Sequence, residues 1–424
     1  MTVDEVAGAG ARPSREARNA RGAVAVLFLT NGALFANILP RYPAIKDALN
    51  LTNAQFGLAV AAFPFGGLVA GLAAGWLIRR VGSPRVAIGA TLLASISFLL
   101  AGVAPIGAIL AVGLFLAGAM DAITDVAQNS HGLQVQRLYG RSILNSFHAV
   151  WSIGAVLGGL MGALAAELAV PLAVHLGVSA VVFSALALAS HRYLLTDREP
   201  GDTATEPVPG TSADRPARPT TGRVATGRVA TYVALAALVV VGSSGALVED
   251  AGSSWSAIYL SASLHASAFA AGAGFIALQG MQFIGRLVGD RLVDRFGQRL
   301  VARTGGLVVL VGMGTALAVP SVAATILGFS LAGFGVATLI PAAMHGADEL
   351  PGLRPGTGLT IVSWLLRVAF LVSPPVVGAI ADATSLRLGL VIVPVAGLLV
   401  LLSSRVLAGV RRDAGAAAPV QVTS

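Results

Sequence analysis

Twelve long apolar stretches constrain the fold of this chain more than any other feature of its sequence. Each is close to the roughly 20 residues that a helix needs to cross a bilayer. Lipid offers the backbone no hydrogen bonds, so each stretch is predicted to be a transmembrane helix. The predicted spans lie near residues 22–40, 54–77, 86–104, 106–130, 142–165, 171–190, 230–250, 267–289, 300–319, 321–343, 357–380 and 386–408. The predicted fold is therefore an all-α membrane protein in the lipid bilayer.

The composition supports this class and excludes several functions. Charged residues make up 11% of the chain, against about 25% in soluble proteins. The chain has no cysteine, which excludes disulfides, thiolate metal sites and a cysteine nucleophile. It has neither a G-x-x-x-x-G-K-[ST] nucleotide motif nor an H-E-x-x-H zinc motif. We therefore expect no enzyme, cofactor or metal site. The sequence does not interleave basic and aromatic residues, so we expect no nucleic-acid partner.

One polar segment divides the spans into two sets of six. Residues 191–229 are rich in Pro, Thr, Asp, Glu and Arg and poor in bulky apolar side chains. Such a segment cannot bury a core, so it is predicted to be a disordered cytoplasmic linker. The predicted parts are a tail at 1–21, a six-helix bundle at 22–190, the linker at 191–229, a second six-helix bundle at 230–408 and a tail at 409–424.

The two predicted bundles share short sequence matches at a nearly constant spacing of about 215 residues, which favours an internal repeat of the kind found in transporters. The matched pairs are R-R-V-G-S-P-R with D-R-F-G-Q-R, P-A-I with S-A-I, His131-Gly132 with His345-Gly346, and Gly162 with Gly378.

The arginines predict the orientation, because basic residues gather on the cytoplasmic side of membrane proteins. With both termini inside, the outer loops hold only Arg41, Lys46 and Arg387, and the remaining arginines outside the spans fall in cytoplasmic segments. The opposite orientation reverses this bias. We expect a multi-pass protein of the inner or plasma membrane with both termini cytoplasmic.

Polar side chains interrupt the fourth and fifth spans in two periodic sets. On a helix each set shares one face, and ionisable groups at membrane depth usually face a protein interior or a wet cavity. The sets are Asp121, Asp125 and Asn129, followed by Asn145, His148 and Trp151. They either line a solute or proton path or pair with each other to lock two helices. On the first interpretation Asp125 and His148 carry protons or gate the solute, and Asp121, Asn129 and Asn145 contact the substrate.

Other spans hold further candidates. Glu249 and Asp250 precede Gly252-Ser253-Ser254, which could unwind the seventh helix and expose backbone carbonyls to a ligand; the alternative is an ordinary helix end near the headgroups. Asn31 and Asn37 in the first span are candidate solute contacts or neutral links between helices. Arg286 is expected to pair with Asp290, four residues further on, or with neighbouring helix ends.

Several longer motifs carry a family resemblance. They are R-Y-P-A-I-K-D-A-L-N-L-T-N-A-Q-F-G, D-V-A-Q-N-S-H-G, N-S-F-H-A-V-W-S-I-G, W-S-A-I-Y-L, G-D-R-L-V-D-R-F-G-Q-R and S-L-R-L-G-L. Together with twelve spans in two halves, they resemble the major facilitator superfamily, and within it the branch that contains the membrane proteins MosC and YbjJ, distant relatives of fucose permease. The resemblance covers about residues 22–408.

The resemblance implies that two bundles rock about a central solute site, giving alternating access, and it suggests small polar solutes. It assigns a substrate contact to Trp255, and Glu249 matches an acid of the branch, which favours proton coupling or solute gating. It also implies a conformational loop motif made of Gly82, Arg85, Asp290, Asp294, Arg295, Gly297 and Arg299.

The chain departs from the family pattern at several positions. Arg79 replaces the usual acid of the first-half loop motif, and Ser254 replaces an acid before Trp255. Asp121 is an additional acid, and Trp364 and Arg367 replace smaller or uncharged residues. These departures suggest a distinct substrate, with Trp364 and Arg367 among its contacts.

Arg367 lies about ten residues, or roughly 15 Å, into its span. An arginine at that depth costs about 2.5 to 3.5 kcal/mol on insertion scales. It is expected either to pair with an internal acid, for which Asp121 is the candidate, or to bind an anionic group of the solute.

Two functional hypotheses follow for a chain expected to act as a monomer. The first is a secondary transporter, coupled to protons, that moves a small polar organic solute. The alternative on the same fold is an exporter of an antibiotic or other biosynthetic product. A membrane receptor on this scaffold is disfavoured, because the sequence contains no large soluble sensory domain.

Overall fold

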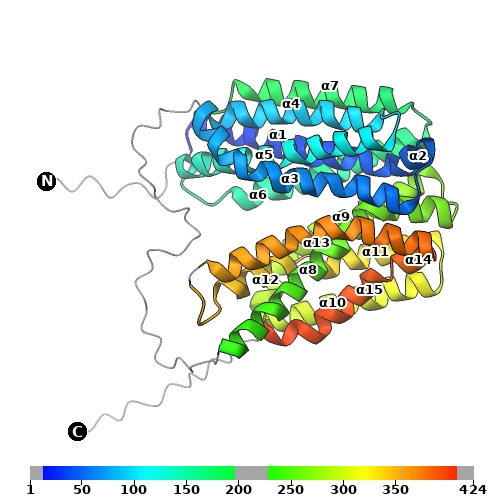
Figure 1. Ribbon diagram of the computed structural model, residues 1–424. Coiled ribbons are helices and arrows are strands. Elements are labelled where there is room, and N and C mark those ends of the chain that lie inside the picture. The colour runs from blue at the N-terminus through cyan, green and yellow to red at the C-terminus, as the bar shows by residue number, and fades with distance from the viewer. Residues whose placement is uncertain (1–12, 196–227, 355, 408–424) are drawn as a thin grey trace, which may run out of the picture.

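A computed structural model describes residues 13–195, 228–354 and 356–407. The first half consists of α1 (Arg15–Ile38), the short turn η1 (Leu39–Arg41), α2 (Tyr42–Ala48), α3 (Asn53–Val81), α4 (Ser83–Gly102), α5 (Gly107–Tyr139), α6 (Leu144–Glu167) and α7 (Leu172–His191). The second half consists of α8 (Arg228–Ile258), a π-helical turn η2 (Tyr259–Ser263), α9 (Ala268–Phe296), α10 (Gln298–Ala318), α11 (Val322–Val336), α12 (Leu339–Asp348), α13 (Thr357–Ala383), α14 (Leu386–Gly389), α15 (Ile392–Ser403) and the turn η3 (Ser404–Val406). Figure 1 shows the two halves as separate helical bundles lying side by side.

The twelve predicted spans are confirmed, since twelve helical segments in the described residues are long and apolar enough to cross a membrane. The first of them starts earlier than expected, inside the predicted tail at 1–21. Ser14 caps α1 there, with its hydroxyl accepting a hydrogen bond from the Ala17 amide at 3.1 Å. Most of the predicted linker and of both tails lies outside the described residues.

The halves are structural repeats. α3 and α9 are each 29 residues long, and each ends at a glycine with positive φ, 91° at Gly82 and 80° at Gly297. Only glycine adopts this backbone conformation without strain, which explains the residue at both turns. The repeats differ further along: α5 is one continuous helix, whereas its counterpart is divided into α11 and α12 at Ala337–Thr338.

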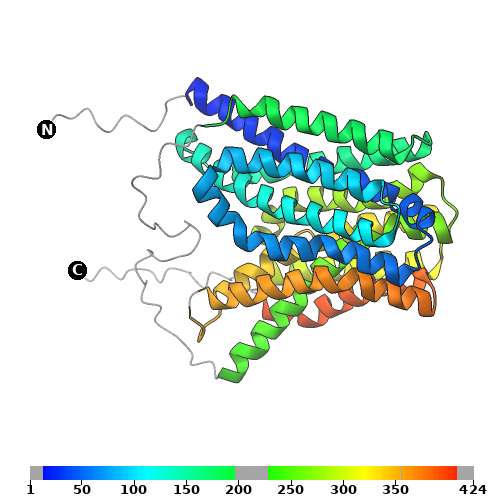
Figure 2. The ribbon, with the colours of Figure 1, turned by 45° about the horizontal axis from the view of Figure 1, so that its top comes forward.

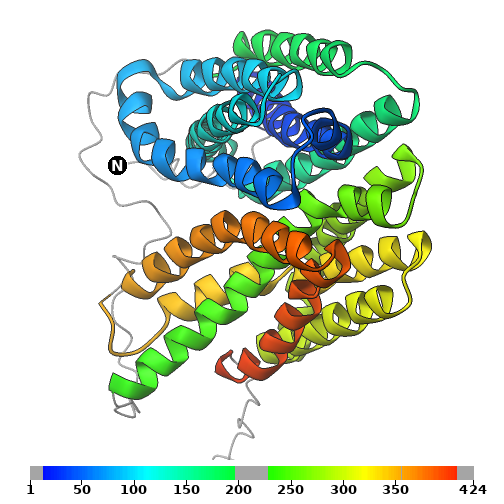
Figure 3. The same ribbon diagram turned by 45° about the vertical axis from the view of Figure 1, so that its right-hand side comes forward.

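The two ends of the molecule differ. We call the end at which α1 and α8 begin and α7 and α15 end the linker end; the opposite end, where α3 and α9 begin and α6 and α13 end, is the closed end (Figure 1). The halves meet mainly through two helix pairs, α3 with α13 and α6 with α9. Figures 2 and 3 show α3 beside α13. The ribbons of the two halves diverge toward the linker end (Figure 1).

Glycines allow the α3–α13 pair to approach closely at the closed end. A methyl group at Gly57 would collide with the backbone of Pro374, and one at Gly378 would collide with the backbone of Asn53. Small residues of this kind are what helix pairs in membranes use to bring their backbones together. The closed end is therefore tightly packed.

Two carboxylates join the halves at the closed end, and we call them the end-caps. Asp382, at the end of α13, accepts hydrogen bonds from the amides of Asn53 and Ala54 at 2.9 and 2.8 Å, where α3 begins. Glu167, at the end of α6, accepts one from the Phe269 amide at 2.7 Å, where α9 begins. Each acid satisfies backbone donors at a helix N-terminus in the opposite half, where negative charge is favourable. The two end-caps occupy equivalent positions of the repeat.

The predicted unwinding of the seventh span at Gly252–Ser254 is wrong. α8 is continuous through these residues and ends at Ile258. The irregular turn comes later, at η2, where the helix widens before it ends. A continuous helix keeps its backbone carbonyls hydrogen-bonded, so the side chains of α8, rather than its carbonyls, face any ligand.

Candidate functional site

A cavity of about 470 Å³ lies between the two halves, within the usual size range of a small-molecule site. α1, α3 and α5 line it from the first half, and α8, α12 and α13 from the second. Its charged lining residues are Asp121, Asp125, Glu249, Asp250 and Arg367. Its apolar and aromatic lining includes Phe35, Leu39, Phe63, Leu366 and Phe370. The charged groups that the sequence singles out in the fourth, seventh and eleventh spans thus meet at one central site.

Three aromatic rings in edge-to-face contact, which we call the aromatic stack, lie on the closed-end side of this cavity. Tyr42 lines the cavity and packs edge-on against Phe56, with ring centroids 5.2 Å apart. Phe56 of α3 packs edge-on against Trp255 of α8 at 5.9 Å, which joins the two halves. Trp255 is fully buried, so the structure places this predicted substrate contact behind the cavity wall.

Asp121 is held by a network within the first half. Asn31 of α1 donates a hydrogen bond to Asp121 Oδ1 at 2.7 Å, and its own Oδ1 accepts one from Trp151 Nε1, also at 2.7 Å. The network links α1, α5 and α6. The proposed Asp121–Arg367 pair does not form: within the described residues no ion pair joins them, and Arg367 has none at all within 4.0 Å. The spacing of these residues along the sequence did not indicate which helix faces pack together.

Asp125 lies one helical turn from Asp121 and is supported by its own helix. Asn129 donates to Asp125 Oδ1 at 2.9 Å and to the Asp125 carbonyl at 2.8 Å, and it lines none of the cavities described here. His148 and Arg367 lie within electrostatic reach of Asp125. A smaller cavity of about 210 Å³ also borders Asp125 and Arg367 and extends to Trp364, whose side chain is half-exposed. Asp125 and Arg367 thus stand between two cavities.

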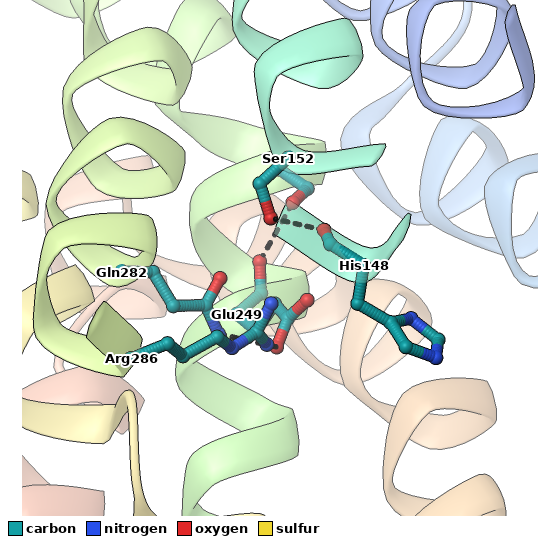
Figure 4. Close-up of polar contacts among 6 residues, drawn as sticks. His148, Ser152, Glu249, Gln282 and Arg286 are labelled. Atoms are coloured by element: carbon teal, nitrogen blue, oxygen red, sulfur yellow. Dashed lines mark hydrogen bonds and ion pairs between the residues drawn. The ribbon is translucent and has the colours of Figure 1, made fainter. Parts of the chain in front are cut away.

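Glu249 is the centre of a cluster in the second half (Figure 4). Gln282 of α9 donates to Glu249 Oε2 at 2.8 Å, and Arg286 Nη2 lies 3.9 Å from the same oxygen. The predicted pairing of Arg286 with Asp290 is therefore wrong; among the described residues Arg286 pairs with Glu249 of the neighbouring helix. The spacing of four residues within α9 suggested the wrong partner because α8 packs against that face.

Three further predicted site residues lie away from the central cavity. Asn37 donates to Ser179 Oγ of α7 at 3.2 Å and is buried between helices. Asn145 is exposed near the start of α6. His148 is exposed on the same helix, with its ring edge-on to Phe28 at 5.2 Å. Figure 4 shows the His148 ring directed away from the Glu249 cluster.

The loop-motif residues lie at the linker end. Gly82 and Gly297 form the two turns described above, and Arg299 donates to the Leu407 carbonyl at 3.0 Å, which fastens the α9–α10 turn to the end of the second half. The others have exposed side chains that make no ion pair with any described residue; they are Arg85, Asp290, Asp294 and Arg295.

Sequence reasoning missed Tyr42 as a cavity residue. It belongs to the R-Y-P-A-I-K motif, which predicts a loop at the end of the first span. The structure folds that loop into η1 and α2, so the ring is only 3% exposed and lies on the cavity wall. The quoted motif was the one available signal, and it did not indicate which side chain turns inward.

Two repeat-related helical bundles around a largely apolar cavity with charged groups on its wall have the architecture of a membrane transporter. The sequence model for the Major Facilitator Superfamily matches residues 24–249, just over half of the chain. The chain belongs to this superfamily of transporters, and it is not an enzyme.

Curated relatives extend the similarity over most of the chain. It is 29% identical over 367 residues to the uncharacterized transporter y4wD of Sinorhizobium fredii, covering 86% of this chain and 92% of that protein. It is 28% identical over 382 residues to the membrane protein MosC of Rhizobium meliloti, covering 90% and 88%. The predicted resemblance to a MosC-like branch is thereby confirmed.

Solved structures share the fold at low sequence identity. A mutant of the nucleoside transporter NupG superimposes with a TM-score of 0.69 at 11% identity, covering 91% of this chain and 98% of that one. A bacterial homologue of the lysosomal transporter Spinster, solved in an inward-facing and unoccupied conformation, also gives 0.69, at 13% identity, covering 94% and 98%. These likenesses establish the fold alone.

Proposed function

We propose that this protein is a proton-coupled secondary transporter that moves a small polar organic solute across the plasma membrane by alternating access. The observation that carries the proposal is the cavity at the boundary between the two halves, with carboxylates from both halves on its wall. Acids at membrane depth are costly and typical of proton and solute paths. We also propose that the protein acts as a monomer, because both halves that line the cavity belong to the same chain.

The arrangement of the halves supports alternating access. With both termini cytoplasmic, as the arginines predict, the closed end faces outward and the linker end faces inward. The structure then corresponds to an inward-facing state, in which the end-caps and the aromatic stack close the outer side. Transport requires these contacts to break and others to form at the linker end, so that the cavity faces each side in turn.

Asp125 is the leading candidate for proton coupling. It lines both cavities, with His148 and Arg367 in electrostatic reach. A change in its charge would therefore be felt by groups on α6 and α13, in both halves. Glu249 is the second candidate, because Gln282 and Arg286 already hold it in place.

The test begins with a thermal-shift screen of small polar solutes on the purified protein, since a ligand of the folded state raises the melting temperature. A solute that binds is then measured in proteoliposomes. We expect Asp125→Asn to abolish accumulation driven by a pH gradient and to keep counterflow exchange. Asp348→Asn, at an exposed acid of α12, is the control. Unchanged pH-gradient-driven transport by Asp125→Asn would refute its role.

A second candidate function is export of a larger amphipathic compound, such as an antibiotic or other biosynthetic product. Two observations favour it: the cavity is largely apolar and aromatic, and the adjoining 210 Å³ cavity offers additional space past Asp125 and Arg367. Filling the second cavity with Gly71→Leu should weaken the binding of a large solute and leave the binding of a small one unchanged. This result distinguishes the two candidate functions.

A further inference from the structure

The central cavity carries an excess of negative groups. Four of its lining residues are acids, Asp121, Asp125, Glu249 and Asp250, and one is basic, Arg367. Arg286 lies beside Glu249 and adds a second positive charge nearby. An anionic solute would meet more acids than bases, whereas a cationic solute would be attracted. The charge of the wall thus argues against the anion site considered for Arg367.

Three of the four acids already have partners. Glu249 is held by Gln282 and Arg286. Asp121 accepts from Asn31 and Asp125 accepts from Asn129. These bonds leave little of each carboxylate for a new ligand, and they fix its position. The fourth acid differs from them.

Asp250 is the acid without a strong partner. Ser254 donates to its Oδ1 at the long distance of 3.4 Å. Its Oδ2 is buried with no hydrogen-bond partner among the described residues, although the buried hydroxyl of Ser373, also without a partner there, lies nearby. A buried carboxylate oxygen without a donor is costly. Such an oxygen on a residue that lines a cavity is best explained by a ligand or a proton that neutralises it.

Tyr42 provides an independent sign of a ligand at the same place. Its side chain is only 3% exposed, it lines the cavity, and its hydroxyl makes no hydrogen bond to any described residue. It lies within electrostatic reach of Asp250 across the boundary between the halves. Phe35, Phe63 and Phe370 line the same cavity. Aromatic faces around a carboxylate are the usual surroundings of a bound organic ammonium ion.

We propose that the solute carries a protonated amine, and that this ammonium group binds between the Asp250 carboxylate and the Tyr42 hydroxyl in exchange for a proton. The inference rests on the proposed transport function and names its substrate class. In this exchange Asp250 holds a proton while no amine is bound. When the ammonium arrives, the Asp250 O–H bond breaks, the proton leaves to water at the linker end, and the carboxylate pairs with the ammonium. No electron is transferred.

Competition for one carboxylate decides the direction of coupling. Asp250 holds either the proton or the ammonium, so the two cannot cross together on this group. The transporter then exchanges an amine for a proton, and an inward proton gradient drives the amine out of the cell. The export hypothesis is therefore favoured for an amine with an apolar body. On this proposal Asp250 carries the exchanged proton, and Asp125, with Arg367 as its nearby counter-charge, gates the solute.

The binding test uses three amines, tyramine, phenethylamine and cyclohexylamine, each paired with its neutral N-acetyl derivative. 3-Phenylpropionate serves as an anion of similar size. We expect at least one amine to raise the melting temperature of the purified protein, and no N-acetyl derivative or anion to do so. Calorimetry in buffers of different ionisation enthalpy should show release of about one proton per amine bound.

Variants locate the site. Asp250→Asn should lower the affinity for the amine by at least about thirtyfold, as expected for loss of a buried charge partner, and should abolish proton release. Tyr42→Phe should lower the affinity by about fivefold, as for one lost hydrogen bond, and should keep proton release. Asp348→Asn should bind as the parent does. The melting temperature of each variant without ligand checks that it is folded.

The proposal is overturned if no amine binds, if 3-phenylpropionate binds in their place, or if Asp250→Asn binds amines as tightly as the parent. It is also overturned if binding releases no proton. Proton-coupled transport of a different solute, with no amine binding, would leave the proposed function standing and remove this inference. Amine binding at Asp250 without proton-driven flux in proteoliposomes would support this inference and remove the proposed transport function.

Discussion

Asn31 connects two side chains that lie far from it in the sequence. It donates to Asp121 and accepts from Trp151, so its amide uses both of its functional atoms in one network. An amide is suited to this position because it offers a donor and an acceptor from the same plane. Asn31 thereby fixes the orientation of Asp121 on the cavity wall.

We predict that Asn31→Ala destabilises the protein, because it leaves the Trp151 N–H and an Asp121 oxygen without partners. Such a loss costs about 1 to 3 kcal/mol for each buried group. The measurement is the melting temperature in detergent, with Asn145→Ala at an exposed position of α6 as the control. Equal melting temperatures for the two variants would contradict the network.

Arg367 gives a second prediction at this scale. Removing its charge with Arg367→Gln should lower expression, since Asp125 loses a nearby positive charge. Adding Asp125→Asn should restore expression, whereas adding Asp121→Asn should not, because Asp121 has Asn31 as its partner. Comparing the two double variants by yield of folded protein decides between the acids. If Asp121→Asn, and not Asp125→Asn, restored the expression of Arg367→Gln, Asp121 would be the ion-pair partner of Arg367.

At the scale of helices, the end-caps connect the fold to its motion. Each joins the last residues of one helix to the first amides of another in the opposite half. Hydrogen bonds to a charged group are worth about 1.5 to 3 kcal/mol. Because the bonds exist only while the closed end is shut, this free energy stabilises one conformational state over the other.

We predict that Asp382→Ala and Glu167→Ala each open the closed end more often, and that the double variant opens it most. A cysteine at Ser373, which is fully buried, reports the opening in a chain that has no other cysteine. Its labelling by an impermeant maleimide should speed up about tenfold per end-cap, the factor that 1.4 kcal/mol produces.

The control for this experiment is Asp47→Ala, at an exposed acid of α2 beside the closed end. It should leave the labelling rate unchanged. If both end-cap variants label at the parent rate, the carboxylates fill hydrogen-bonding needs of α3 and α9 without biasing the conformational equilibrium. Circular dichroism of each variant establishes that the helices remain intact.

At the scale of the whole molecule, the orientation in the membrane determines what each end does. The linker end carries the loop motif, and the arginines predict that it faces the cytoplasm. We predict that a cysteine at Gly210 in the linker is not labelled by an impermeant reagent in intact cells and is labelled after lysis. A cysteine at Asn50, between α2 and α3, should be labelled in intact cells. The opposite pattern would invert the topology and with it the direction of coupling.

Much of the architecture was predictable from the sequence. A helix that crosses lipid needs about 20 apolar residues wherever it lies in the chain, so local composition revealed the spans. The repeat was visible as matched motifs, and Gly82 and Gly297 occupy equivalent turns with positive φ. Asp121, Asp125 and Arg367 were recognised because charges at membrane depth are costly, and Glu249 because it matches an acid of the MosC-like branch. All four line one cavity.

The partners of these residues depended on the tertiary structure. Helical periodicity fixes which residues share a face but not which helix that face meets. Asp121, one of the two candidate partners considered for Arg367, instead accepts a hydrogen bond from Asn31. Arg286 was assigned to Asp290 and pairs with Glu249 for the same reason. The end-caps and Tyr42 became visible only when the halves were assembled. Composition determines that a segment enters the membrane, whereas packing between helices distant in sequence decides which polar groups meet there.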